Sequence, residues 1–402
     1  MTSWRPWTRK TATSNSRTCG NRPNVSGSII TAMKYSKFIL VPIFVVLSLF
    51  HCSVAQKQAE NKSFKIIGYY QGKAGDVSNY EYKKLTHIIF CFTDLKGNKI
   101  SFKDTADERT LRLLVAQKRK NPQLKVLVSL GGWSGCATCS PIFAIDSNRI
   151  IFARSVKNFI LHYGLDGFDL DWESPVIGGY KDHPASPKDK DNFTSLIKEL
   201  RQALPSPNIV CFDANSFPEY VFSSVDWSNV MPNVDFVNLM TYGLPNDKSG
   251  HSGHHTALYS SPFQKESVQS GVKLLDSLKV PLDKIIIGAA FYSFVVVDVD
   301  SVNFGLGRPG KIKNSPDYRT TQKKFTAENG YKTYWDTISM APYLYSFKER
   351  TFVTLDNKES CRLKTKFALD HQLGGIMFWR LNGDTKEDGL LNAIYETNEN
   401  YR

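Results

Sequence analysis

Eight short apolar segments, rich in β-branched residues, recur along the chain from residue 64 onward. They are 64–70, 85–92, 124–130, 165–171, 208–213, 234–240, 284–291 and 373–379. Apolar runs of this length are typical of strands that are buried on both faces, as in a parallel sheet. The pattern therefore predicts eight strands of one parallel sheet.

Amphipathic stretches with helical spacing separate several of these segments. They include 107–119, 148–163, 188–203 and 266–278. Strand and helix in alternation, repeated eight times, predict an α/β fold of the (β/α)8 or TIM-barrel type. The alternative is an open doubly wound sheet, but 68–72 (Gly-Tyr-Tyr-Gln-Gly) stands where such a sheet has its glycine-rich phosphate loop.

The interval between the last two apolar segments is longer than one helix with two loops requires. We therefore expect a small insertion between barrel strands 7 and 8, at about 294–342, on the C-terminal rim of the barrel. The rest of 56–402 is expected to form one catalytic barrel, without a separate carbohydrate-binding module.

Residues 1–55 have the pattern of a leader. Its core is 33–55: a basic start, an apolar run at 38–50, and small residues at 53–55 where a signal peptidase cuts. The alternative is a membrane anchor, but 13 residues are too few to span about 30 Å of hydrocarbon. We expect a secreted protein, extracellular or periplasmic, with no stable membrane anchor.

The formal net charge of the chain is +13. The leader contains seven basic residues and no acidic residue, so the net charge of the remaining chain is +6. That is an ordinary surface, and no basic run with interleaved aromatics indicates nucleic-acid binding. Cys136 and Cys139 could form a redox pair, half a zinc site or a small disulfide, which an exported loop favours. Cys91, Cys211 and Cys361 are expected to be buried thiols.

Acidic residues alternate along the fourth strand segment and just beyond it. Since side chains alternate on a strand, Asp169, Asp171 and Glu173 should point into the barrel, about 6.6 Å apart. Burial and mutual repulsion disfavour ionising all of them, so one member should have a raised pKa, as a general acid requires. A calcium site would need loop geometry and backbone carbonyls instead of a rigid strand.

The motif Asp166-x-x-Asp169-x-Asp171-x-Glu173 resembles the D-x-x-D-x-D-x-E signature of glycoside hydrolase family 18, the chitinases. The resemblance extends over most of the mature chain. Other motifs on successive predicted strands also match: 129–133 (Ser-Leu-Gly-Gly-Trp), 240–242 (Met-Thr-Tyr) and 377–379 (Met-Phe-Trp). Tyr69 and Phe92 match aromatic positions of the first two strands.

The resemblance implies a role for each matched residue. Glu173 would be the proton donor, with Asp171, Asp169 and Tyr242 as further catalytic residues. The substrate-binding positions would be Trp379, Tyr69, Phe92, Trp133 and Met240. Structural support would come from Asp166, Ser129, Gly131 and Gly132.

Acids in a row on one strand share one side of a bound sugar, whereas ordinary glycosidases place two carboxyls on opposite faces. Neither Asp169 nor Asp171 is then placed to attack from the far side of Glu173. The nucleophile must be water or a group on the substrate, such as the 2-acetamido carbonyl. The resemblance therefore implies a secreted, monomeric chitinase that needs no cofactor or metal and acts with retention on chitin or its oligosaccharides.

Three departures from the family pattern are visible. Gly243 stands where an aspartate usually follows the tyrosine, Ser174 replaces an aromatic residue, and 293–294 replaces a nearby arginine. His251, His254 and His255 could suggest a metal, but the segment resembles a family loop. Two alternative functions remain: a lectin-like protein that binds chitin with weak or no catalysis, and an endo-β-N-acetylglucosaminidase acting on N-glycans.

Overall fold

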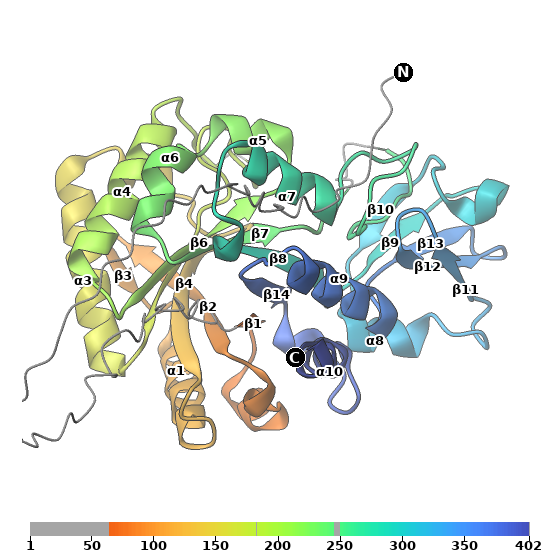
Figure 1. The fold of residues 1–402 in the computed structure, drawn as a ribbon, viewed down its shortest axis with the longest axis horizontal. Helices are drawn as coiled ribbons and strands as arrows, with labels where there is room; N and C mark the ends of the chain where they lie inside the picture. The colour runs from red at the N-terminus through yellow and green to blue at the C-terminus, as the bar shows by residue number, and fades with distance from the viewer. Residues whose placement is uncertain (1–63, 182, 245–249, 402) are drawn as a thin grey trace, which may run out of the picture. The chain divides into compact units, whose positions relative to one another are not determined.

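The computed structural model describes residues 64–181, 183–244 and 250–401. The expected leader, 1–55, lies outside these residues. Eight parallel strands form the central sheet (Figure 1). They are β1 (Lys65–Tyr70), β2 (His87–Lys96), β4 (Lys125–Gly131), β5 (Gly167–Asp171), β6 (Ile209–Asn215), β7 (Phe236–Met240), β8 (Ile285–Ala290) and β14 (Gly375–Trp379).

The sheet closes on itself because β1 pairs with both β14 and β2. Ile67 lies opposite Met377 on one side and His87 on the other. The (β/α)8 barrel predicted from the apolar segments is thereby confirmed. A short strand, β3 (Lys99–Ser101), extends β2 as an antiparallel hairpin.

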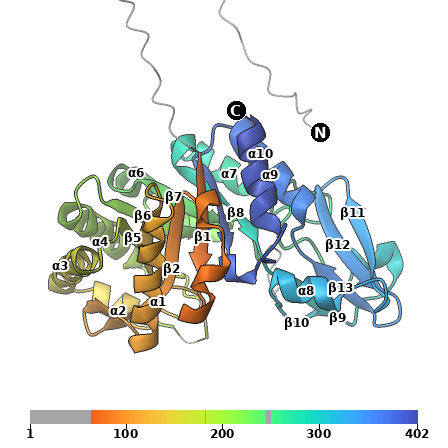
Figure 2. The ribbon, with the colours of Figure 1, turned by 90° about the horizontal axis from the view of Figure 1, so that it is seen from below.

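Helices follow most barrel strands and cover the outside of the barrel (Figure 2). The longer ones are α1 (Thr105–Ala116), α3 (Asp146–Tyr163), α4 (Asp189–Ala203), α7 (Val268–Ser277), α9 (Lys358–Asp370) and α10 (Leu390–Tyr401). Shorter ones are α2 (Cys139–Phe143), α5 (Pro218–Ser223), α6 (Trp227–Val230) and α8 (Tyr318–Lys324). Capping defines several ends: the Asp104 carboxylate accepts the Ala106 and Asp107 N–H groups at the start of α1.

A second, antiparallel sheet lies between β8 and β14 in the chain. Its strands, in spatial order, are β10 (Lys311–Asn314), β9 (Phe294–Val297), β13 (Thr351–Thr354), β12 (Ala341–Ser346) and β11 (Lys332–Asp336). The sheet therefore continues past residue 342, the expected end of the insertion, because β12 and β13 form a hairpin within it. Aromatic stacking, such as Tyr343 on Phe352 at 5.0 Å, fills its core.

The barrel has two hydrophobic layers. Side chains that point outward pack against the helices, and Phe168, Leu170 and Trp172 belong to this layer. Inward-pointing residues such as Ile67, Leu127 and Ile286 form a smaller cluster inside the barrel. No helix in the described part of the chain combines the length and apolarity needed to cross a membrane.

Candidate active site

The strand β5 directs its acidic side chains into the barrel. Phe168, Leu170 and Trp172 pack outward, and Trp172 contacts the Phe143 ring at a centroid distance of 5.8 Å. Asp169 and Asp171 lie between them in sequence and are buried, whereas Glu173 follows the strand and is half-buried. The alternation predicted for this segment is therefore present.

Asp169 is the best hydrogen-bonded acid of the group. Its carboxylate accepts hydrogen bonds from Ser129 Oγ at 2.7 Å, Cys211 Sγ at 3.1 Å and Asn238 Nδ2 at 3.3 Å. The Tyr69 hydroxyl lies within 3.4 Å of the same carboxylate. Strands β1, β4, β6 and β7 thus all contribute to one polar cluster around β5.

Sequence analysis missed two members of this cluster, Asp213 on β6 and Asn238 on β7. The Tyr69 hydroxyl donates to Asp213 Oδ1 at 2.6 Å and accepts from Asn238 Nδ2 at 2.7 Å. Both residues are polar positions in largely apolar strands, and neither belongs to an alternating run of acids like the one that identified Asp169. Each is buried in the barrel.

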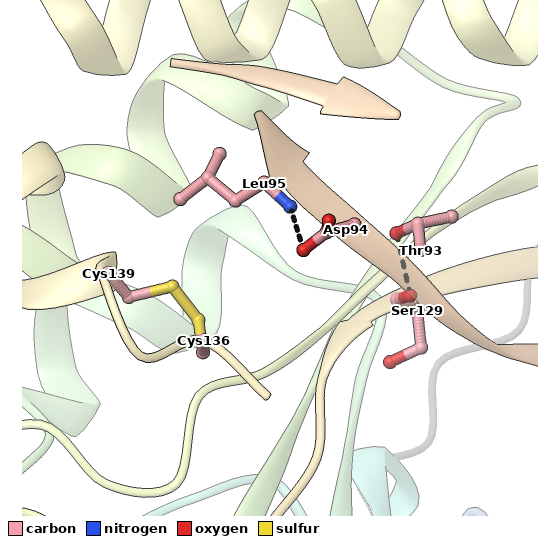
Figure 3. The surroundings of a disulfide bond; sticks show 6 residues. All are labelled: Thr93, Asp94, Leu95, Ser129, Cys136 and Cys139. Atoms are coloured by element: carbon pink, nitrogen blue, oxygen red, sulfur yellow. Dashed lines mark hydrogen bonds between the residues drawn. A yellow bond between two sulfur atoms is a disulfide. The ribbon is translucent and has the colours of Figure 1, made fainter. Parts of the chain in front are cut away.

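Ser129 and two glycines hold β4 tightly against β5. Thr93 Oγ1 donates to the Ser129 carbonyl at 2.8 Å, which fixes the backbone beneath the serine (Figure 3). The Gly132 N–H donates to the Asp171 carbonyl at 2.9 Å. Gly131 has φ of +128°, and a Cβ there would lie 1.8 Å from the Asp171 carbonyl oxygen. Only glycine permits this approach.

Burial raises the pKa values of the inner acids. The pKa of Glu173 is raised to about 7, chiefly because desolvation disfavours its ionised form. Desolvation, followed by the charges of Glu173 and Asp169, raises the pKa of Asp171 well above its usual range. Asp171 Oδ1 is buried without a hydrogen-bond partner. Among the described residues, no lysine, arginine or histidine forms an ion pair with these acids.

Aromatic side chains surround the acids at the C-terminal end of the barrel. Trp379, the last residue of β14, stacks on Phe92 with a centroid distance of 5.6 Å and lies 5.8 Å from the Tyr69 ring. Trp379, Met240 and Tyr242 pack on the inner cluster but are only partly buried. These residues provide a partly exposed apolar surface above the acids.

Tyr242 follows β7 and lies over β8. Its hydroxyl is 3.8 Å from Met377 Sδ, and its ring makes an edge contact with Tyr292 at 5.9 Å. Gly288 makes room for the ring, because a Cβ at this position would lie 2.7 Å from it. Desolvation by burial, with a contribution from the charge of Asp213, raises the pKa of the Tyr242 hydroxyl. The phenol therefore stays protonated and can donate a hydrogen bond.

Trp133 and Asp166 lie apart from this cluster. Trp133 is 58% exposed and contacts the Tyr180 ring at 6.2 Å. Asp166 stands just before β5, where it accepts the Val126 N–H at 2.7 Å and forms an ion pair with Lys118 at 2.6 Å. Its contacts connect the start of β5 to β4 and to the 3-10 helix η3 (Gln117–Arg119) that follows α1.

The segment after β4 contains a disulfide between Cys136 and Cys139 (Figure 3). This is the alternative that the sequence favoured for the two cysteines. Cys91, Cys211 and Cys361 are buried free thiols, which confirms their prediction. Desolvation raises the pKa of the Cys211 thiol, so it stays protonated and donates to Asp169.

The departures noted in the sequence have defined surroundings. Gly243 has φ of +74°, and a Cβ there would meet no atom of the described residues within 4 Å. Ser174 is buried beside Glu173. Ser293 is buried, and its hydroxyl lies 2.7 Å from that of Thr321.

The described histidines of the loop after β7 do not gather around one point. His254 Nε2 lies 3.0 Å from an Asp336 carboxylate oxygen, whereas the His255 ring lies against the tilted Phe294 ring at a centroid distance of 4.8 Å. Within the described residues, no group of three or more histidine, cysteine or acidic side chains has the arrangement of a metal site.

The arrangement combines the half-buried Glu173, whose pKa of about 7 keeps it largely protonated just below neutral pH, with the buried Asp171 two residues earlier on β5. The Tyr242 phenol is a hydrogen-bond donor, and the aromatic residues provide an apolar surface. Such a set can protonate a leaving group and stabilise a positive charge that develops beside it. The three acids stand at every second residue, Asp169 and Asp171 on β5 and Glu173 just after it.

Comparisons with known proteins agree with this geometry. Residues 65–384 match the model of the family described as glycosyl hydrolases family 18. Chitinase A1 of Niallia circulans is 26% identical over 88% of this chain, which spans 62% of that protein. Chitotriosidase-1 of Mus musculus is 28% identical over 76% of this chain and 68% of its own length.

A solved structure, a family 18 N-acetylglucosaminidase from Paenibacillus barengoltzii, superposes with a TM-score of 0.76. It is 33% identical, and the alignment covers 83% of this chain and 100% of that one.

Proposed function

The chain belongs to glycosyl hydrolases family 18, and we propose that it hydrolyses the β-1,4 bonds between N-acetylglucosamine units of chitin or its oligosaccharides. One observation carries the proposal: Asp169 and Asp171 are buried on β5, Glu173 is half-buried just after it, and desolvation raises the pKa of Glu173 to about 7. The similarity to Chitinase A1 and Chitotriosidase-1 supports the same substrate class.

Glu173 acts in this proposal as the general acid. Desolvation keeps its carboxyl protonated up to about pH 7, so it delivers a proton to the glycosidic oxygen as the bond breaks. Its half-buried position after the end of β5 leaves it accessible to the substrate. General acid catalysis of this kind contributes about 10²- to 10⁴-fold in rate.

The nucleophile is the acetamido carbonyl oxygen of the sugar itself. Attack on C1 from the face opposite Glu173 turns the acetamide into a cationic oxazolinium, and a carboxylate beside it stabilises that charge. Asp171 takes this role and orients the acetamide N–H, while Asp169 accepts a share of its proton. The Tyr242 hydroxyl, protonated because its pKa is raised by burial, donates to the acetamide oxygen.

The sugar ring rests on the Trp379 side chain, which Phe92 and Tyr69 hold from beneath. Met240 borders the same surface, and the exposed Trp133 offers a further platform toward the leaving group. The chain acts as a secreted monomer without cofactor or metal in this proposal.

Two other functions are tested by the same experiment. A lectin-like protein would bind chitin without cutting it, but the acids of β5 remain in place here. An enzyme acting on N-glycans, or one that releases single sugars as the name of the Paenibacillus neighbour implies for that protein, would give different products.

The test is digestion of chitin hexasaccharide by the purified mature protein, with products identified by mass spectrometry. We expect shorter N-acetylglucosamine oligomers, and no products from the Glu173→Gln variant. An intact hexasaccharide that nevertheless binds would contradict hydrolysis and favour the lectin. Cleavage of an N-glycan but not of the hexasaccharide would contradict the assignment of chitin as the substrate and favour an enzyme that acts on N-glycans.

A further inference from the structure

Asp213 lies inside the barrel on β6 and has no role in the reaction proposed above. Its side chain is buried, and its Oδ1 accepts the Tyr69 hydroxyl at 2.6 Å. No donor among the described residues faces its Oδ2. The carboxyls of Asp213 and Asp169 lie close enough to interact directly, and the Tyr69 hydroxyl bridges them, 2.6 Å from Asp213 Oδ1 and 3.4 Å from Asp169 Oδ2. Two ionised carboxylates only accept hydrogen bonds, so this contact requires a proton on one of them.

The donors around the two carboxyls decide which of them holds the proton. Asp169 accepts from Ser129, Cys211 and Asn238, which favours its ionised form. Among the described residues, the Asp213 carboxyl accepts a hydrogen bond from the Tyr69 hydroxyl only. Desolvation and then the charge of Asp169 raise the pKa of Asp213 well above its usual range. The geometry and the electrostatics both put the proton on Asp213.

Among the described residues, no lysine, arginine or histidine forms an ion pair with Asp213. The titratable groups that interact with it include acids, phenols and thiols: Asp169, Asp171, Tyr69, Tyr220, Tyr242, Cys91 and Cys211. A bound proton is therefore the available means of neutralising Asp213.

We infer that Asp213 is a positioning residue for the hydrolysis proposed above: it keeps a proton at the pH of the reaction and donates it in a hydrogen bond to Asp169. The inner acids then carry one negative charge, shared by Asp169 and Asp171, where the cationic intermediate requires it. Because a donated hydrogen bond stabilises a carboxylate, that charge persists to lower pH than it would without Asp213. The inference rests on the proposed function.

The pH dependence of kcat/KM on a chitin oligosaccharide tests this role in the Asp213→Asn and Asp213→Leu variants. Asparagine reproduces the protonated acid, since its amide donates to Asp169 and its oxygen accepts from Tyr69, so the profile should keep its shape. Leucine removes the donor, so the acidic limb should move up by about one pH unit. Asp235→Asn, an exposed acid before β7 that pairs with Arg201, is the control and should leave the limb in place.

Two outcomes would overturn the inference. If Asp213 is ionised, Asp213→Asn removes a negative charge, and both limbs of its profile move to lower pH. If Asp213 only fills space, Asp213→Leu leaves the acidic limb unchanged. Should the leucine variant fail to fold, the asparagine variant still distinguishes a protonated from an ionised Asp213.

Infrared difference spectroscopy separates this inference from the proposed function. At neutral pH the wild type should show a carboxylic-acid C=O stretching band that Asp213→Asn lacks and Asp235→Asn retains. Absence of that difference would contradict a proton on Asp213, whatever the enzyme cleaves. A protein that shows the band but leaves chitin oligosaccharides intact would support the proton on Asp213 and contradict the proposed function alone.

Discussion

Two groups of buried acids in this chain are neutralised in opposite ways. Asp356, between β13 and α9, pairs with Lys364 at 2.6 Å, and both side chains are fully buried. It also accepts hydrogen bonds from Ser360 and from the Ala290 N–H at the end of β8. The acids inside the barrel have only hydroxyl, thiol, amide and carboxyl neighbours among the described residues.

This difference in neighbouring groups indicates different roles for Asp356 and for the acids inside the barrel. The carboxylate of Asp356, paired with Lys364, connects the end of the second sheet to the barrel. Acids without a cation must hold protons instead, and those protons can move. The inner group is therefore suited to proton transfer, and Asp356 with Lys364 to holding the fold together.

The largest effect is expected from Lys364→Met, which leaves Asp356 buried without its cation. Breaking a buried ion pair in this way costs about 3–5 kcal/mol. We expect the free energy of unfolding, measured by urea titration, to fall by this amount. Lys366→Met, which removes the lysine of an exposed pair with Asp370 on the same helix, is the control and should leave the urea midpoint unchanged. Equal midpoints for the two variants would show that Asp356 does not depend on Lys364.

Glu173→Gln should affect catalysis and spare the fold. It removes the proton that the leaving group needs, so kcat on chitin hexasaccharide should fall by at least about 10²-fold. Binding of the oligosaccharide, measured by calorimetry, should persist. Glu359→Gln, an exposed glutamate that pairs with Arg362, is the matched control and should keep full activity. Near-normal turnover by Glu173→Gln would contradict the assignment of the general acid.

A smaller effect is expected on the pH dependence of stability. The pKa of Glu173 is raised to about 7 in the folded chain, against about 4.3 in an unfolded one, so folding takes up a proton between these values. The stability that this proton gives is complete below about pH 4 and is lost as the pH rises through 7. Wild-type protein should therefore lose roughly 2 kcal/mol more of its free energy of unfolding from pH 5 to pH 8 than Glu173→Gln does. Parallel losses in urea titrations of the two proteins would argue against a raised pKa.

The barrel could be predicted from the sequence because its signal is local. Most strands are largely apolar runs, and on β5 the alternation of Asp169, Leu170 and Asp171 specifies which side chains face inward. The close approach of Gly131 to the Asp171 carbonyl could be placed only through the matched motif, since its cause is the register of β4 on β5.

The missed residues depend on contacts between distant strands. Asp213 and Asn238 meet the Tyr69 hydroxyl only because β1 closes the barrel on the opposite side, 144 and 169 residues away in sequence. The end of the second sheet was missed for a similar reason, because β13 pairs with β9 across the whole insertion. The hydrophobic pattern of a single segment does not indicate which distant strand it will contact, so neither set of contacts could be predicted from it.

The central claim is that the substrate's own acetamide is the nucleophile, and the configuration of the first product tests it most directly. Attack by the acetamide oxygen and then by water inverts C1 twice, so NMR should detect β-anomers at the earliest times of chitin hexasaccharide cleavage. The same mechanism leaves a fully deacetylated chitosan oligomer uncut. Initial α-anomers, or cleavage of that oligomer at a rate comparable with chitin, would contradict the account.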